Sequence, residues 1–159
     1  MEFNEDTTWK NVMEFSAFLK KRRESGADVP YGYAQHHGTF AWTTQLDIQR
    51  MMFAHGRWLD WEIDDKLGSK TPPPSNWGDE QSVLLMQKFK DHADVCHPDN
   101  LANGTLELNT VYQAGDIAMQ VQYHEFAASI EDEKTSKAAG GRTGYAPCPK
   151  GEPSWIVNG

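Results

Sequence analysis

The sequence predicts a mainly α-helical protein. We expect an irregular bundle of about four helices, an aromatic loop or short hairpin near residues 30–43, and an extended C-terminal arm. Apolar residues recur at intervals of three and four along most of the chain. Stretches rich in Gly and Pro separate these periodic segments. With 159 residues the chain has the length of one domain, so we expect a helical domain over 1–137 and a docking arm over 138–159.

Residues 41–67 form the segment around which we expect the other helices to pack. The segment has no Pro and a single Gly, at position 56. Its apolar residues step by three and four, which predicts one buried face of a helix. That face is Ile48, Met52, His55, Leu59 and Ile63. Phe53 and Trp61 project from roughly the opposite side, so we expect them to contact another segment or a partner protein.

A first helix is predicted from Asp6 or Thr7 to about Ser25. Its inner face is Trp9, Val12, Met13, Ser16 and Leu19. The basic run at 20–23 suits the negative end of the helix dipole, and Gly26 suits the position after the last turn. The following segment, 27–40, alternates aromatic and small residues, which fits either the loop or the hairpin.

A third helix is predicted from Ser75 or Asp79 to about Cys96. Three consecutive prolines at 72–74 predict an extended polyproline connector before it. Pro98 ends it, because the residue before a proline is disfavoured in helical geometry. Its predicted inner side is Val83, Leu85, Met86, Phe89, Ala93 and Cys96.

The fourth helix is predicted over residues 105–134. Leu108, Tyr112, Met119, Tyr123 and others repeat by threes and fours. Residues 117–123 also alternate as a strand would, and Gly115 and Asp116 offer a break. One long helix matches the spacing better than strands do.

The arm at 138–159 is rich in Gly, Pro and small residues, so we expect no regular structure in it. Its large apolar residues are Tyr145, Trp155, Ile156 and Val157. Contacts made by these side chains must offset the entropy lost when the arm is ordered. We expect them to bind a partner, with Trp155 in a pocket of a neighbouring subunit rather than on its own core.

Charge and composition exclude several classes of partner. A formal net charge of −8 argues against a sequence-independent grip on nucleic acid or on anionic lipid. No apolar run approaches the roughly 20 residues of a membrane span, and the acidic N-terminus does not resemble a signal peptide. Two cysteines, Cys96 and Cys148, are too few for a disulfide framework, although one bridge between them is left open. We therefore expect an intracellular protein or one within an assembled particle.

The strongest candidate for chemistry is a metal site at His92 and Cys96. The two residues are four apart on the predicted third helix and share a face, as zinc ligands can. A distant histidine would have to complete the site, and no CxxC or HExxH motif supports it. A half-buried histidine beside a small buried cysteine at a helix end explains the pair better. We expect no catalytic, cofactor-binding or metal-binding residue.

These observations favour a non-enzymatic structural or accessory subunit of a larger assembly. A virion, an organellar complex and a cytoskeletal lattice are the assemblies considered, with other protein subunits as partners. A small metal-dependent hydrolase that uses His92, Cys96 and a distant His is the alternative. An acidic inhibitor protein is the third hypothesis.

Overall fold

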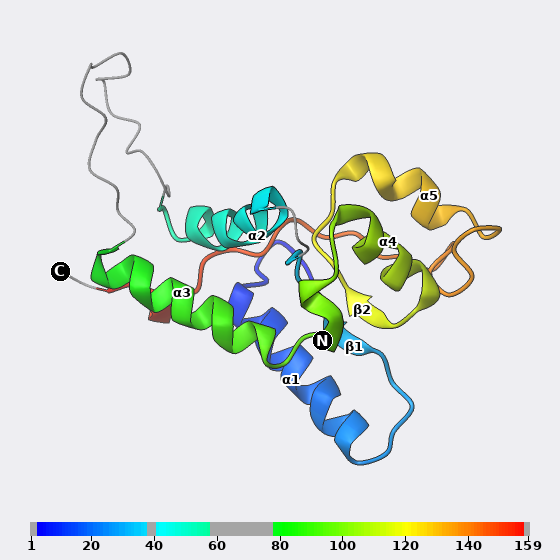
Figure 1. Ribbon diagram of the computed structural model, residues 1–159, viewed down its shortest axis with the longest axis horizontal. Helices are drawn as coiled ribbons and strands as arrows, with labels where there is room; N and C mark the ends of the chain where they lie inside the picture. Colours follow the sequence, from blue (N-terminus) through cyan, green and yellow to red (C-terminus); the bar gives the residue numbers. More distant parts are fainter. Residues whose placement is uncertain (1–2, 38–40, 58–77, 158–159) are drawn as a thin grey trace.

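A computed structural model describes residues 3–37, 41–57 and 78–157. Its helices and strands are α1 (Trp9–Glu24), β1 (Tyr31–Tyr33), α2 (Ala41–Ala54), α3 (Glu80–Ala93), α4 (Thr105–Ala114), β2 (Ile117–Met119) and α5 (Ala127–Glu131). In this part of the chain, five α-helices and two short strands confirm the predicted mainly α-helical, irregular fold. Figure 1 shows α4 and α5 on one side of the strands and α2 and α3 on the other.

Helix α1 follows its sequence closely. Thr8, and not the predicted Asp6 or Thr7, caps its N-terminus. The Asn11 side chain in turn accepts a hydrogen bond from the backbone N–H of Thr8, which completes a capping box. Gly26 follows the last turn with a φ of 87°, a left-handed conformation that favours glycine. The predicted inner face is correct at four positions: Trp9, Val12, Ser16 and Leu19 are buried.

The two strands form a parallel pair, in which Tyr31 lies opposite Ile117 and Tyr33 lies opposite Met119. The partner of β1 is therefore far along the chain rather than in a local hairpin. The predicted helix over 105–134 is wrong, because α4 ends at Ala114 and Gly115 adopts a φ of 88°. Ile117 lies in β2 and not in a helix, and it is buried against Ala34 of the segment after β1.

Helix α2 ends earlier than the sequence predicts. Gly56 takes a φ of 72° two residues after its end, so the helix does not continue through that position. Of the predicted buried face, Met52 is buried and Ile48 is half-buried. Other residues predicted for this helix, and the proline connector after it, lie outside the described residues. These are Leu59, Trp61, Ile63 and Pro72–Pro74.

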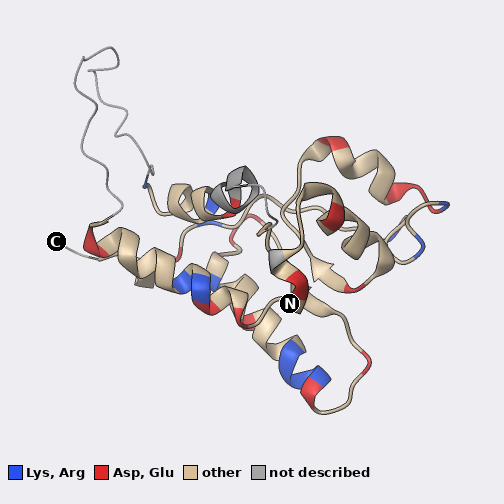
Figure 2. Ribbon diagram, in the orientation of Figure 1, with Lys and Arg blue, Asp and Glu red and all other residues tan. Residues whose placement is uncertain are grey.

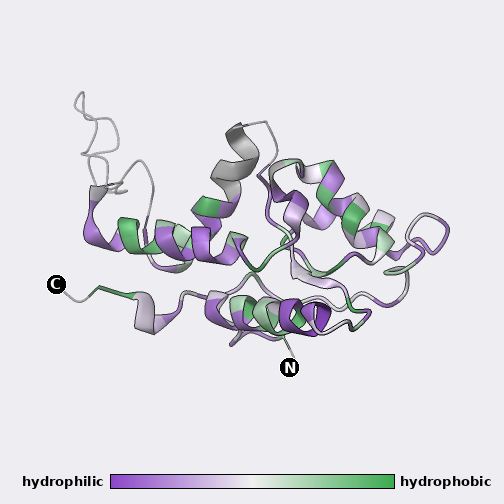
Figure 3. Cartoon of the chain, turned by 60° about the horizontal axis from the view of Figure 1, so that its bottom comes forward, coloured by the Kyte–Doolittle hydropathy of each residue, from purple (hydrophilic) through white to green (hydrophobic). Residues whose placement is uncertain are grey.

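Helix α3 begins at its predicted cap. The Asp79 carboxylate accepts a hydrogen bond from the backbone N–H of Ser82. Leu85 and Phe89 face the core, but Val83 is exposed, contrary to its predicted inner position. Figure 3 shows that the helices carry both hydrophobic and hydrophilic residues, as expected of helices with one buried side.

The main core joins α1, β1, α2, α3 and the C-terminal arm. Its buried members are Trp9, Val12, Tyr33, Met51, Met52, Leu85, Phe89, Cys96 and Trp155. The arm also pairs with the start of α1, since Lys150 and Thr8 form a parallel bridge. Gln81 of α3 donates to the carbonyl of Trp155 and accepts from the N–H of Val157. Trp155 thus lies in the core of its own chain, and the expectation that a neighbouring subunit provides its pocket is wrong.

Charged residues are spread over the helices, with a basic group at the end of α1 (Figure 2). Both signs of charge thus occur along the described helices. None of the helices in the described ranges has the length and apolar character needed to cross a bilayer.

Candidate functional site at the strand ends

The carboxyl ends of β1 and β2 lie side by side because the strands are parallel. The chain continues from β1 into residues 34–37 and from β2 into residues 120–124. Ligands commonly bind at the carboxyl ends of parallel strands, where loops leave the sheet together. We call these two segments, with Asp47 and Arg50 of α2, the strand-end site.

Asp47 is the buried charge of the strand-end site, with 2% of its surface exposed. It accepts a hydrogen bond of 2.6 Å from the backbone N–H of His36, and its other oxygen lies 3.1 Å from Nδ1 of the same residue. Burial alone raises the pKa of this carboxyl, but bonds from His36 and the charges of His36 and Arg50 lower it below its ordinary value. Asp47 is therefore a carboxylate held by two neighbours.

Arg50 joins the two segments of the site. Its guanidinium donates to Oδ1 of Asp47 at 2.8 Å and to the carbonyl of Val121 at 3.3 Å. The same group lies 5.7 Å from the centre of the Tyr123 ring, within the range of a cation–π contact. One side chain of α2 thus holds the segment after β2 against the segment after β1.

The segment after β1 is fixed by polar contacts from the loop that follows α3. The Asn100 side chain accepts from the N–H of Gln35 at 3.0 Å, and the Asn100 carbonyl accepts from the N–H of His37 at 3.2 Å. The Gln35 amide donates to the Phe89 carbonyl at 3.4 Å. These bonds hold the backbone of residues 35–37 in one conformation and leave side-chain atoms for other partners.

Several buried polar atoms here have no hydrogen-bond partner among the described residues. They are the Tyr33 hydroxyl, Oε1 of Gln35, Nε2 of His36, Nε2 of His37, and both amide atoms of Gln120. Leaving such a group unpaired costs about 1–3 kcal/mol, so a ligand that pairs with it recovers that free energy. Burial and the charge of Asp47 raise the pKa of Tyr33 well above its ordinary value, so its hydroxyl keeps its proton.

A cavity of about 790 Å³ adjoins the strand-end site. Its lining includes Tyr33, Met119, Gln120 and Tyr123, together with residues 142–149 of the arm. Small-molecule sites typically have volumes of about 300–1,000 Å³ and combine apolar walls with a few polar groups. This cavity has that size and that mixture.

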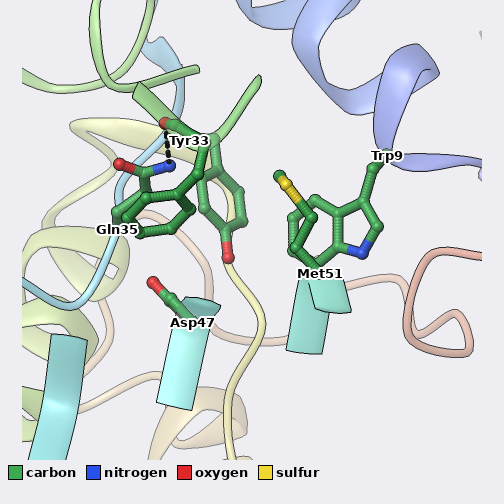
Figure 4. Close-up of a pocket in the computed structure, with 6 residues that line it drawn as sticks. Trp9, Tyr33, Gln35, Asp47 and Met51 are labelled. Carbon is green, nitrogen blue, oxygen red and sulfur yellow. Dashed lines mark hydrogen bonds between the residues drawn. The ribbon is translucent and has the colours of Figure 1, made fainter. Parts of the chain in front are cut away.

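A second, smaller pocket lies on the inner side of Tyr33. Figure 4 shows the Tyr33 ring among Trp9, Gln35 and Met51, with its hydroxyl on the same side as the Asp47 carboxylate. Tyr33 therefore borders both this pocket and the larger cavity.

His92 and Cys96, the predicted metal candidates, belong to the core. The His92 ring stacks on Tyr33, and burial lowers its pKa to about 4. Cys96 is buried, and burial raises the pKa of its thiol well above its ordinary value. Within the described residues, no three His, Cys, Asp or Glu side chains are grouped to hold a metal ion.

The residues predicted to bind a partner differ in exposure. Phe53, Tyr145 and Ile156 are exposed, Val157 is half-buried, and Trp155 is in the core. Trp61 lies outside the described residues. Only Tyr145 of this set lines the cavity. That these side chains bind a partner protein stays a prediction.

Sequence reasoning missed the residues that form the strand-end site: Asp47, Arg50, Gln120 and Tyr123. For Gln120 and Tyr123, the local signal was the alternation over 117–123, which also fitted a helix. Asp47 and Arg50 follow the pattern of an ordinary polar side of a helix.

Comparison with known proteins gives one informative match. No protein-family model matches the chain, and no curated protein sequence does. Among solved structures, the chain is similar to an ABC transporter solute-binding protein from Agrobacterium vitis with bound D-mannitol. The TM-score is 0.74 at 17% sequence identity, and the match covers 94% of this chain and 33% of that protein. The chain therefore spans about a third of the length of the protein it resembles.

At this level of identity the likeness shows the fold. The chain shares its fold with about a third of a solute-binding protein, and this likeness contradicts the prediction of a structural or accessory subunit of a virion, organellar complex or cytoskeletal lattice. The protein's mainly helical architecture is thus shared with part of a ligand-binding protein of a transporter.

Proposed function

We propose that this chain forms part of a solute-binding protein and holds a small polyhydroxylated solute, such as a sugar alcohol, at the strand-end site. The observation that carries the proposal is the meeting of two parallel strand ends beside a cavity of about 790 Å³. The fold shared with a protein that has D-mannitol bound supports the same class of ligand.

The side chains at the strand-end site suit a sugar alcohol. Each hydroxyl of such a solute both donates and accepts hydrogen bonds. The Gln120 amide and the Tyr33 hydroxyl offer both functions, and both are without a partner among the described residues. The rings of Tyr112 and Tyr123 also line the cavity and offer apolar faces for the carbon chain. The proposal requires recognition alone, with no bond made or broken.

A whole solute-binding protein would place further segments around the solute. The similar protein is about three times as long as the part it shares with this chain. In our proposal those segments close over the strand-end site and add contacts from the open side of the cavity. Any protein partner of the exposed Phe53, Tyr145 and Ile156 would then belong to the transporter. The predicted intracellular location stays a prediction.

Calorimetric titration of the purified chain with D-mannitol tests the proposal. We expect saturable binding that weakens about tenfold in Gln120→Ala, because one or more hydrogen bonds to the solute are lost. Gln87→Ala is a matched control, since Gln87 lies on the exposed side of α3 and bonds Asp91. The proposal fails if neither D-mannitol nor any other polyol or sugar binds, or if the two variants behave alike.

A further inference from the structure

We propose that the Asp47–Arg50 pair sets the charge preference of the strand-end site, so that the site takes an uncharged polyol and rejects the corresponding sugar acid. This inference rests on the proposed function and adds a specificity-determining pair to it. It predicts that neutralising the Asp47 carboxylate alters which solute binds.

The pair has the position that the inference requires. Arg50 touches both segments of the site, through Asp47 on one side and the Val121 carbonyl and Tyr123 ring on the other. Val121 and Tyr123 line the cavity directly. Arg50 contacts both of these residues, so its guanidinium lies directly behind the part of the cavity wall that they form.

The charge of Arg50 is already matched. Asp47 lies 2.8 Å from it, and the Asp47 and Arg50 side chains are 2% and 16% exposed. A solute carboxylate arriving here would meet the negative charge of Asp47 as well as the positive charge of Arg50. In a partly buried site the two effects oppose each other at short range, so the anion gains little and still loses its water. A neutral hydroxyl does not incur that loss.

The charged side chain that lines the cavity among the described residues, Arg142, is more exposed than the pair. Exposed charges are screened by water and salt, so they contribute little to the choice between an anion and a neutral solute. We therefore expect selectivity to depend on Asp47 and Arg50 and not on Arg142.

Three related solutes test the charge preference at neutral pH. D-Mannitol is neutral, D-mannonate carries a carboxylate in place of one terminal alcohol group, and 1-amino-1-deoxy-D-mannitol carries an ammonium group. The wild-type chain should bind D-mannitol at least about tenfold more tightly than D-mannonate, because a charge that is desolvated without a free partner costs more than a paired hydroxyl.

Asp47→Asn removes one charge and nearly preserves the shape of the side chain. It leaves the Arg50 cation, which does not titrate, without its carboxylate. We expect the affinity for D-mannonate relative to D-mannitol to rise about tenfold, since a charge-assisted hydrogen bond becomes available to the solute. Arg50→Gln leaves Asp47 unpaired and should raise the relative affinity for the amino polyol. The double variant Asp47→Asn/Arg50→Gln restores neutrality and should return to the wild-type preference.

Arg57 and Asp79 provide a matched control, because they form a second Arg–Asp pair at 2.7 Å, on the surface and outside the strand-end site. Asn replaces Asp79 with little cost as a helix cap. Asp79→Asn should leave all affinity ratios unchanged. Arg142→Gln should leave them nearly unchanged, and a large effect there would place the selectivity on the rim instead.

The outcomes separate the inference from the proposed function. If the wild-type chain binds none of the three solutes, the charge inference fails, and the proposed function fails with it when no other polyol or sugar binds either. If it binds D-mannitol, but the ratios are the same in Asp47→Asn and Asp79→Asn, only the charge inference is overturned. Thermal melting of each variant checks folding. If Asp47→Asn does not fold, Arg50→Gln and the neutral double variant decide the question by the same ratios.

Discussion

The His92 ring stacks on the Tyr33 ring with their centres 5.0 Å apart and their planes 23° from parallel. His92 is fully buried, and neither ring nitrogen has a hydrogen-bond partner among the described residues. Tyr33 also lines the cavity, so this contact joins the core of α3 to the strand-end site. A positive charge on His92 would have no acceptor there.

The stacked histidine predicts a stability that falls in mild acid. Burial lowers the pKa of His92 from 6.5 to about 4, so the unfolded chain binds the proton more readily than the folded one. The stability gained from a neutral His92 is fully present above pH 6.5 and is lost as the pH falls toward 4, by about 3 kcal/mol in all. Burial lowers the pKa of His37 as well, which adds in the same direction.

Urea unfolding of the wild-type chain and of His92→Phe across this pH range measures the effect. The Phe variant keeps an aromatic ring on Tyr33 but cannot be protonated, so its stability should change less between pH 6.5 and 4. Asp47 affects the stability in a separate pH range. Because its pKa is lowered in the folded chain, its contribution to stability is lost only when the pH drops below about 3.8. Equal slopes for both proteins between pH 6.5 and 4 would mean that His92 is not the proton-linked group.

At Gly32 the packing of β1 against α1 leaves no room for a side chain. Gly32 lies at the centre of β1, and a Cβ built there would overlap the backbone and side chain of Ser16 in α1. Gly32→Ala should therefore destabilise the fold by about 3 kcal/mol, since α1 and β1 have to move apart. Gly78→Ala is the control, because a Cβ at Gly78 meets no atom within 4 Å. A similar loss in both variants, measured by thermal melting, would show that close packing at Gly32 is not the cause.

Trp155 should stabilise the chain itself. Its side chain is 8% exposed, and its carbonyl is bonded by Gln81 of α3. Trp155→Ala should cost about 3–5 kcal/mol in the isolated chain. Ile156→Ala, at the exposed neighbouring residue, should stay within about 0.5 kcal/mol. If urea unfolding of the isolated chain finds no loss for Trp155→Ala, the arm does not belong to the core.

Local signals were sufficient for α1 and α3. The Asp79 cap of α3 and the glycine after α1 were predicted from nearby residues alone, although the cap of α1 is Thr8 and not the predicted Asp6 or Thr7. The prediction for 105–134 failed because residues 117–123 also alternate as a strand would, although one long helix matched the spacing better. Only the left-handed Gly115 and a strand partner at Tyr31–Tyr33, far away in the chain, decide between them.

The candidate site was missed for a related reason. Asp47 and Arg50 gain their roles from His36 and Val121, which lie on other segments. A helix pattern marks both residues as polar and solvent-facing, and nothing local shows that Asp47 is buried. Trp155 was misplaced in the same way, because Gln81 and the α3 surface that receive it are remote in sequence.

The central claim is that the ends of β1 and β2 hold a polyol. Titration of the isotope-labelled chain with D-mannitol, followed by backbone amide NMR, tests it most directly. Our account predicts saturable shift changes concentrated at residues 34–37 and 120–124, with little change at exposed positions of α3 such as Gln87. No saturable change up to high concentrations of D-mannitol, or changes confined to residues outside the strand-end site, would contradict it.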